Sequence, residues 1–222
     1  MLLNAPPHRL TALLDTHSFF SQGASTVSPI RLVRLAKERG FTGLALTDDA
    51  SVGGAVDLCH GGDEAGLSTV IGTTLPVLVE RPGRRDAFDV FPFVLLAQNR
   101  VGYARINVLL SQFKQGEQPG LPLAALLADT TGLVLLSGTR RGFPTVMGVE
   151  RRLDQLSTLL TTLKRAFPNR LYLQLYYDAY PGMRRTLGFL RAVARDHGLP
   201  CVAAPEIRLA DQSEYPLLDA LS

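Results

Sequence analysis

Short hydrophobic runs alternate with stretches of helical periodicity along most of this chain. Short apolar runs between turn-forming residues are typical of buried strands, whereas apolar positions repeated every three or four residues are typical of amphipathic helices. A Ser-Pro pair at residues 28–29 begins the clearest helix, because Ser is a favoured N-cap and Pro fits the first turn. The pattern predicts strands at residues 10–14, 43–47, 69–74, 76–80, 90–97, 133–137, 171–175 and 201–204, and helices at residues 29–39, 54–65, 102–113, 149–167, 183–197 and from 213.

The repeated order of strand and helix predicts an α/β fold. Strands without polar alternation are expected to be buried on both faces, as in a parallel sheet that is covered by helices. The sequence contains no internal repeat and no low-complexity linker, and 222 residues are within the size of one large domain. We therefore predict a single domain over residues 1–222 with about seven mostly parallel strands.

The composition is that of a globular protein outside the membrane. Hydrophobic residues make up 46% of the chain and charged residues 19%, which is ordinary for a packed domain. The most apolar region, residues 120–138, is interrupted by polar residues and falls short of the ~20 apolar residues that cross a bilayer. The N-terminus lacks the pattern of a signal peptide, and two cysteines without metal-binding spacing favour a reducing compartment. We expect a cytoplasmic protein without a membrane partner.

The basic residues offer only a weak argument for nucleic-acid binding. The net charge is +3 and the pI is about 9.1, so the field of the whole protein is small. Nearly all basic residues are arginines, with doublets at residues 84–85, 140–141, 151–152 and 184–185. Arginines on solvated helix faces are the favoured interpretation of these doublets. Contact with DNA is therefore expected to be indirect.

Polar side chains follow several predicted strands at the edge where α/β folds place their ligand sites. Asp15 and His17 follow the first strand, Asp48 and Asp49 the second, and Glu206 the last. One imidazole with several carboxylates is a poor site for Zn²⁺ but suits Mg²⁺ or Mn²⁺. The alternative is that the three aspartates cap helices or close turns and hold no ion.

The sequence offers little other chemistry. It has no G-x-S-x-G elbow, no Walker loop and no G-x-G-x-x-G motif. Cys59 and Cys201 lie in apolar helix and strand patterns. We therefore predict that both are buried small hydrophobic residues and not nucleophiles.

A series of short motifs covers nearly the whole chain. They are Asp15-Thr-His-Ser-Phe-Phe-Ser21, Gly23-Ala-Ser25, Ser28-Pro29, Ala45-Leu-Thr-Asp48, Gly53-Gly-Ala-Val56, Ala65-Gly66, Ile71-Gly72, Leu95-Leu-Ala97, Gly102-Tyr103, Leu135-Leu-Ser-Gly138 and Val202-Ala203. In this order and spacing they resemble the polymerase and histidinol phosphatase (PHP) domain. The resemblance is to the form found at the N-terminus of the bacterial DNA polymerase III alpha subunit and of error-prone DNA polymerases. It implies a distorted (β/α) barrel of TIM-like architecture.

The resemblance also implies that the metal site of the family is degenerate here. In the family, histidines and carboxylates at the strand ends hold a cluster of metal ions. Of these ligands His17 is unchanged, and Asp15, Asp49 and Glu206 are carboxylate substitutes. The remaining ligand positions of the family are occupied by Gly23 or Ala24, Thr74, Pro92, Thr139 and Arg208. We expect the Arg208 guanidinium to pair with Asp49, Asp15 or Glu206 in place of a metal ion.

Two functions follow from the resemblance. The favoured one is a degenerate PHP domain without a cofactor and without phosphoesterase activity. It would pack against the polymerase domains of a parent DNA-directed DNA polymerase, or against an accessory protein of replication or repair. The alternative is an active phosphoesterase or 3′-exonuclease, with Mn²⁺, Mg²⁺ or Zn²⁺ bound by the residues Asp15, His17, Asp48, Asp49 and Glu206.

Overall fold

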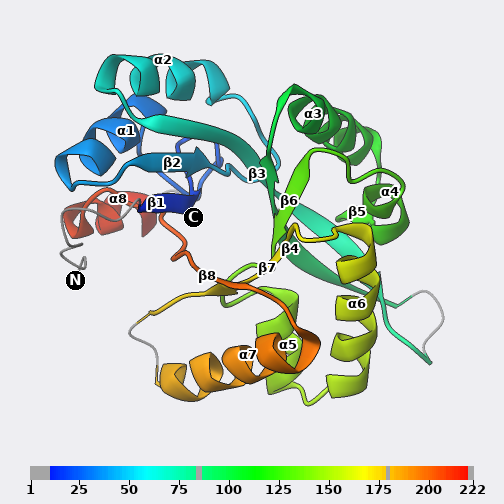
Figure 1. The fold of residues 1–222 in the computed structure, drawn as a ribbon. Coiled ribbons are helices and arrows are strands. Elements are labelled where there is room, and N and C mark those ends of the chain that lie inside the picture. Colours follow the sequence, from blue (N-terminus) through cyan, green and yellow to red (C-terminus); the bar gives the residue numbers. More distant parts are fainter. Residues whose placement is uncertain (1–10, 84–86, 179–180, 220–222) are drawn as a thin grey trace. The chain divides into compact units, whose positions relative to one another are not determined.

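The computed structural model describes residues 11–83, 87–178 and 181–219 (Figure 1). The chain forms two compact units, of which unit 1 comprises residues 1–73 and 206–222 and unit 2 comprises residues 74–205. The chain leaves unit 1 within strand β3 (Ser68–Glu80) and returns to it at Glu206. Both units combine strands with helices, which confirms the predicted α/β class. A single domain over residues 1–222 stays a prediction.

Unit 1 is built on three parallel strands. β1 (Ala12–Thr16) pairs with β2 (Gly43–Leu46), and β2 pairs with the first residues of β3. The helices α1 (Pro29–Glu38) and α2 (Ala55–Ala65) lie side by side, and α1 packs on β2 (Figure 1). The core contains Val33 of α1, Leu44 of β2 and Leu58 of α2. The returning segment ends in the short helix α8 (Tyr215–Asp219).

The local signals in unit 1 predicted its elements closely. Ser28 caps α1, because its hydroxyl accepts a hydrogen bond from the Arg31 amide at 3.2 Å. The first strand lies at residues 12–16 and not at 10–14, because Thr16 still pairs with Leu46 of β2. Leu10, which the prediction included, lies outside the described residues.

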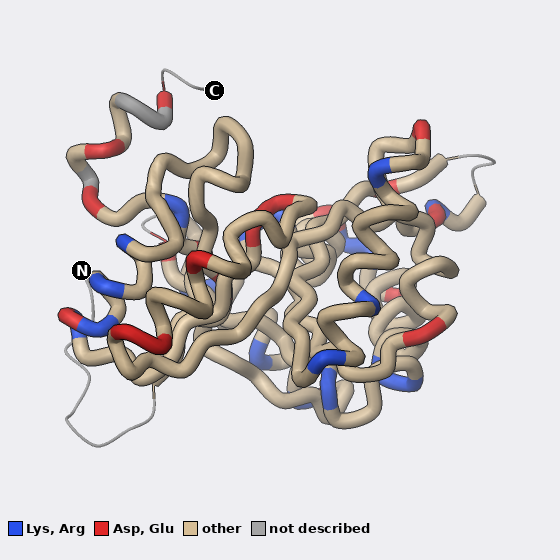
Figure 2. The backbone as a smooth tube through the Cα atoms, turned by 90° about the horizontal axis from the view of Figure 1, so that it is seen from above, with Lys and Arg blue, Asp and Glu red and all other residues tan. Residues whose placement is uncertain are grey.

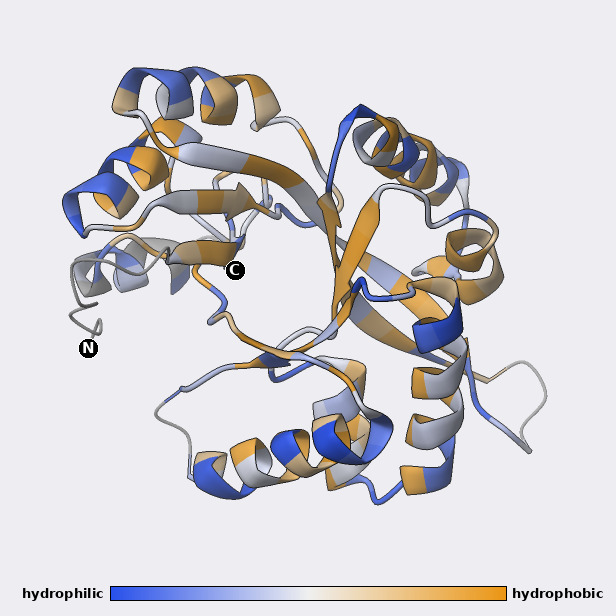
Figure 3. Cartoon of the chain, viewed as in Figure 1, coloured by the Kyte–Doolittle hydropathy of each residue, from blue (hydrophilic) through white to orange (hydrophobic). Residues whose placement is uncertain are grey.

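Unit 2 contains a longer mixed sheet. After β3 the strand order is β4 (Phe88–Ala97), β6 (Leu133–Leu136), β7 (Leu171–Leu175) and β8 (Cys201–Ala203), and the short β5 (Leu121–Pro122) pairs with β3. β4 and β6 are antiparallel, whereas β6–β7 and β7–β8 are parallel. The strands are largely hydrophobic, and the helices alternate hydrophobic and hydrophilic positions (Figure 3). The helices are α3 (Arg100–Gln115), α4 (Leu123–Leu127), α5 (Phe143–Val149), α6 (Leu153–Ala166) and α7 (Met183–His197). Within the described part of the chain, no helix is long and apolar enough to cross a bilayer.

The sequence pattern misplaced two boundaries in unit 2. The strands predicted at residues 69–74 and 76–80 form one continuous strand, because Pro76 falls between the residues that pair with β2 and those that pair with β5. The helix predicted at residues 149–167 begins only at Leu153, as α6, and Val149 is the last residue of the separate helix α5, which the sequence pattern missed. Arg151 has a φ of 58° between α5 and α6, a left-handed conformation that no helix can continue through.

The prediction that both cysteines are buried is wrong. Cys59 and Cys201 are free thiols with exposed side chains. Cys59 lies on α2 beside the buried Leu58 and faces away from the core. Cys201 begins β8, which is the last in the order of strands that the described residues of unit 2 form, so it lies at an edge of that sheet. An apolar run indicates that a strand is present, but it does not indicate whether that strand is central or at an edge.

A buried carboxylate joins three elements of unit 2. Asp89 of β4 is 8% exposed, and it binds the guanidinium groups of Arg81 at 2.8 Å and Arg152 at 2.5 Å. Burial alone would raise the pKa of Asp89, but the hydrogen bonds from Arg81 and Arg152 outweigh it and lower that pKa below its usual value. These two ion pairs link β4 to Arg81, which follows β3, and to Arg152, which precedes α6.

Candidate functional site

The candidate site lies in unit 1, where two strands and the returning segment end together. β1 is followed by His17, and β2 is followed by Asp48 and Asp49. Residues 206–208 run parallel to the end of β1, because the Ile207 amide donates to the Asp15 carbonyl at 2.9 Å and the His17 amide donates to the Ile207 carbonyl at 2.8 Å. The five predicted ligands therefore come from three segments that meet at one edge.

His17 is surrounded by acidic groups. Its side chain is buried, and its Nε2 lies 3.1 Å from Asp15 Oδ1. Its Nδ1 lies 3.2 Å from Ser21 Oγ and 3.5 Å from Asp49 Oδ1. Both ring nitrogens therefore face protein oxygen atoms. The same Asp15 oxygen accepts a hydrogen bond from the Thr47 hydroxyl at 3.1 Å.

Asp48 closes the loop that follows β1. Its Oδ1 accepts from the Ser18 amide at 2.6 Å and from the Ser21 hydroxyl at 2.8 Å. Its Oδ2 accepts from the Ser18 hydroxyl at 2.8 Å. A buried carboxylate with three hydrogen bonds fixes the loop geometry, which is the turn-closing role that the alternative interpretation of Asp48 predicted. These serines were missed by sequence reasoning, although the His17-Ser-Phe-Phe-Ser21 motif places both of them beside the ligand.

Ser21, His17 and Asp15 lie in the order of a catalytic triad, but they do not have its chemistry. Ser21 is 0% exposed, so a substrate cannot reach its hydroxyl. That hydroxyl donates to Asp48 and accepts from the Asp49 amide at 3.0 Å. A nucleophilic serine needs an accessible oxygen and a base that takes its proton. Ser21 is therefore a positioning residue.

Arg208 binds two of the predicted ligands. Its two terminal nitrogens bind the two oxygens of Asp49 at 2.7 and 3.2 Å, and its Nε binds Glu206 Oε1 at 2.5 Å. The predicted pairing of Arg208 with Asp49 and Glu206 is thus confirmed. The pair is only partly buried, with 28% of Arg208, 38% of Asp49 and 34% of Glu206 exposed. Burial would lower the pKa of Arg208, but the bonds to Asp49 and the charge of Glu206 outweigh it and raise that pKa.

These contacts do not fit a cluster of metal ions. A guanidinium carries a permanent positive charge, and here it holds both oxygens of Asp49. The oxygens of Asp48 are occupied by amide and hydroxyl donors. Among the residues that the structure describes, no three His, Cys, Asp or Glu side chains are arranged to hold one ion. Thr74, Pro92 and Thr139, which the resemblance placed at other ligand positions, belong to unit 2.

Comparison with known proteins agrees with this reading of the fold. The family model described as PHP domain matches residues 14–176. The error-prone DNA polymerase of Symbiobacterium thermophilum is 30% identical over 94% of this chain, and the DNA polymerase III subunit alpha of Caulobacter vibrioides is 27% identical over 94%. The chain spans 20% and 19% of the lengths of these relatives. A candidate metal-dependent phosphoesterase from Bifidobacterium adolescentis has a similar structure, with a TM-score of 0.59, 14% identity, and coverage of 91% of this chain and 89% of that one. This likeness shows the fold.

Proposed function

Because this chain belongs to the PHP domain family, we propose that it is the PHP domain of a bacterial polymerase alpha subunit in which an arginine has replaced the metal ions. In this role it supports other parts of a cytoplasmic replication or repair polymerase and does not hydrolyse phosphoesters. The relatives are about five times as long as this chain, so a PHP domain is one part of each of them.

The observation that carries this proposal is the position of Arg208. The side chains that would have to bind cations converge at one edge of unit 1, and a cation is already bound there as part of the chain. A guanidinium can neutralise Asp49 and hold it in a two-pronged geometry, as a metal ion would. It cannot coordinate a water molecule as a Lewis acid and so lower the pKa of that water, which is the step that metal-dependent phosphoesterases require. The arginine therefore neutralises and positions the carboxylate as a metal ion would, but it does not activate water.

The hydroxyl groups around the site support the same conclusion. The Asp48 carboxylate accepts hydrogen bonds from the hydroxyls of Ser18 and Ser21. The Thr47 hydroxyl donates to the Asp15 carboxylate, and the Thr73 hydroxyl donates to the Asp48 carbonyl. Each of these bonds satisfies a buried acceptor with a protein donor. The loop is thus held by hydrogen bonds that need no ion.

Elemental analysis of the purified protein tests the proposal directly. After dialysis against Mn²⁺ and then against buffer, we expect far less than one bound ion per chain. The protein should show no hydrolysis of a phosphomonoester or of a 3′-ended oligonucleotide in the presence of Mn²⁺. The triple variant Asp15→His, Asp49→His and Arg208→His serves as the matched control, since it adds imidazoles at ligand positions of the family. The variant should retain more Mn²⁺ than the wild type.

The second candidate function is an active phosphoesterase with a carboxylate-rich Mn²⁺ or Mg²⁺ site. The observation that favours it is that two carboxylates lie beside one imidazole. Asp15 Oδ1 is 3.1 Å from His17 Nε2, and Asp49 Oδ1 is 3.5 Å from His17 Nδ1. One stoichiometric ion in the wild type, together with Mn²⁺-dependent hydrolysis that the variant His17→Ala abolishes, would establish this function. The proposal of an arginine in place of the metal would then be wrong.

The supporting role can be tested by mixing this chain with the other domains of a polymerase and looking for a complex. The chain should form a complex with the remainder of a DNA polymerase III alpha subunit and co-elute with it in size-exclusion chromatography. The variant Asp89→Asn, which alters a residue of unit 2, distinguishes loss of folding from loss of contact if its circular dichroism is measured in parallel. Elution of the two wild-type components as separate peaks at micromolar concentration would contradict this role.

A further inference from the structure

The two units carry opposite charge. Unit 2 contains 17 Lys and Arg against 9 Asp and Glu, a difference of +8, whereas unit 1 contains 6 against 11, a difference of −5. The net charge of +3 for the whole chain conceals this division. Figure 2 colours these positions along the backbone. A local excess of this size creates a field that attracts anions to one unit, even though the average over the chain is small.

The basic residues of unit 2 include an ordered row on α7. Arg184, Arg191 and Arg195 are seven and four residues apart, so at 3.6 residues per turn they point within about 40° of one direction around the helix axis. All three are exposed. At 1.5 Å per residue the row is about 16 Å long. We call these three residues the α7 arginine row.

The α7 arginine row lies on a helix that packs into unit 2, and the row is open to solvent. The other face of the helix packs into unit 2 through Met183, Leu190 and Val193. At Gly188, which shares the direction of the row, an added Cβ would meet nothing within 4 Å. In the described residues we find no ion pair to Arg184 or to Arg191.

Two basic groups near the C-terminal end of α7 already have partners. Lys164 of α6 donates from its ammonium group to the His197 carbonyl at 2.6 Å, which places it at the C-terminal end of α7. Arg195 contacts the exposed Asp196 at 3.1 Å, and a surface pair of this kind contributes little and exchanges readily for another anion. The row therefore presents its charge to a partner.

We propose that the α7 arginine row binds the phosphate backbone of a nucleic acid strand. A line of arginines about 16 Å long fits a chain of regularly spaced phosphates, which carries one charge per ~3.4 Å of each strand in a duplex. Arginine binds phosphate oxygens through two donors at once. An anionic membrane fits poorly, because the apolar residues of α7 are buried or partly buried in unit 2 and none of them is an exposed anchor for a bilayer. The surface is separate from the site at Arg208 and does not depend on its function.

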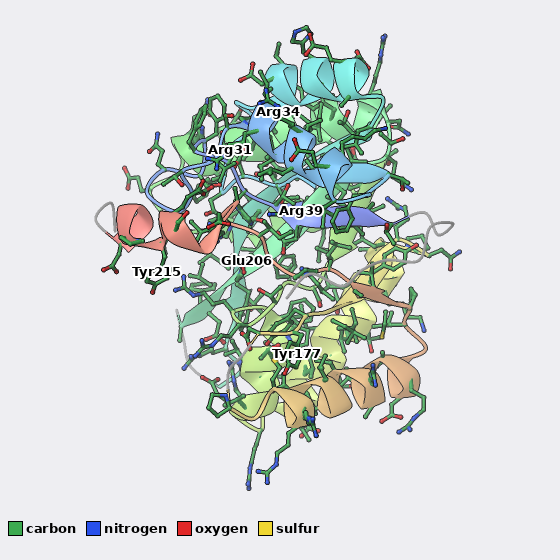
Figure 4. The ribbon with its side chains drawn as sticks, turned by 90° about the vertical axis from the view of Figure 1, so that its left-hand side faces the viewer. Arg31, Arg34, Arg39, Tyr177, Glu206 and Tyr215 are labelled. Atoms are coloured by element: carbon green, nitrogen blue, oxygen red, sulfur yellow. The ribbon has the colours of Figure 1, made fainter. Side chains whose placement is uncertain are left out.

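Binding of a fluorescein-labelled 20-nucleotide single strand to the full chain tests this inference. The double variant Arg184→Gln with Arg191→Gln should weaken binding at least about tenfold near 50 mM salt. It should also lower the slope of log K against log salt by about 1.4, since each lost phosphate contact of a single strand contributes ~0.7. The matched control removes two charges from unit 1, Arg34→Gln with Lys37→Gln. Both residues are exposed on α1, and Figure 4 labels Arg34. It should change affinity less than twofold.

The other outcomes each decide against the proposal. Equal weakening by the two double variants would show that only total charge matters. Equal affinity for polyglutamate of the same length would assign the row to acidic proteins, and tighter binding to vesicles with about 30% phosphatidylserine would assign it to a membrane. Absence of binding to the oligonucleotide at about 50 mM salt would overturn the inference outright. Thermal melting of each variant shows whether the fold is retained.

Discussion

Removing the Arg208 guanidinium should destabilise unit 1 and create a weak cation site. In the variant Arg208→Ala, Asp49 and Glu206 lose their shared cation and remain as neighbouring negative charges. The resulting loss in the free energy of unfolding has an upper bound of about 3–5 kcal/mol, which is the cost of removing one partner from a fully buried ion pair. Its lower bound is about 0–1 kcal/mol, the value of an exposed pair.

The exposure of the three side chains sets the value between these bounds. About one third of each is accessible, with 28% for Arg208, 38% for Asp49 and 34% for Glu206, so water and salt screen much of the charge. The two-pronged contact with Asp49 is stronger than a single contact. We therefore expect a loss of about 1–2 kcal/mol, which for a chain of this size lowers Tm by roughly 2–8 °C.

Thermal unfolding with and without Mn²⁺ is the assay. The matched control is Arg195→Ala, which removes an arginine from an exposed pair with Asp196 that is 79% and 61% accessible, and it should change the stability by less than about 0.5 kcal/mol. Millimolar Mn²⁺ should raise the Tm of Arg208→Ala more than that of the wild type, since only the variant has lost the cation that Asp49 and Glu206 share.

Two results would refute this reasoning. A Tm of Arg208→Ala within 1 °C of the Arg195→Ala control would show that the pair contributes nothing to stability. An equal response of variant and wild type to Mn²⁺ would show that Arg208 does not occupy the place of a cation. High salt offers a further check, because it should reduce the difference between Arg208→Ala and the wild type.

Three further perturbations test the rest of the structure. Asp89→Asn should lower the free energy of unfolding in urea by about 2–4 kcal/mol, because it leaves two arginines without their buried carboxylate. Since folding lowers the pKa of Asp89, the stability that this carboxylate contributes should be complete above about pH 4 and disappear as the pH falls through the lowered pKa. A difference from the wild type that does not change with pH would contradict this. Gly102→Ala should lower Tm by more than about 5 °C, because a Cβ there would lie 1.9 Å from the Gly132 carbonyl, whereas Gly188→Ala at an open position should not. Ser21→Ala should cost about 1–2 kcal/mol by leaving Asp48 with an unmade buried hydrogen bond, and a neutral result in the same melting assay would show that the loop is held without it.

Much of the fold was predictable from local pattern. The start of α1 is marked by Ser28 and Pro29, and α7 was placed at its observed bounds because its apolar positions repeat with the helical period. The order of the motifs along the chain also identified the family. These signals involve residues close in sequence, which is why one sequence suffices to read them.

The candidate site was only half predictable. The sequence indicated that Asp15, His17, Asp48, Asp49 and Glu206 would gather at a strand edge, because parallel strands end at the same side. It did not indicate that Ser18 and Ser21 would occupy the oxygens of Asp48. That arrangement depends on the path of the loop after β1.

The sequence by itself determined the class of the fold and the family, because both depend on the identity and spacing of residues along the chain. Only the tertiary structure decided which carboxylates Arg208 holds, since Asp49 lies 159 positions away and is brought to it by the return of the chain beside β1. It also decided that Cys201 is exposed and that the positive charge collects in one unit. The physical reason is that contacts between distant segments are set by tertiary packing, whereas the hydrophobic periodicity of a sequence describes only one helix or strand at a time.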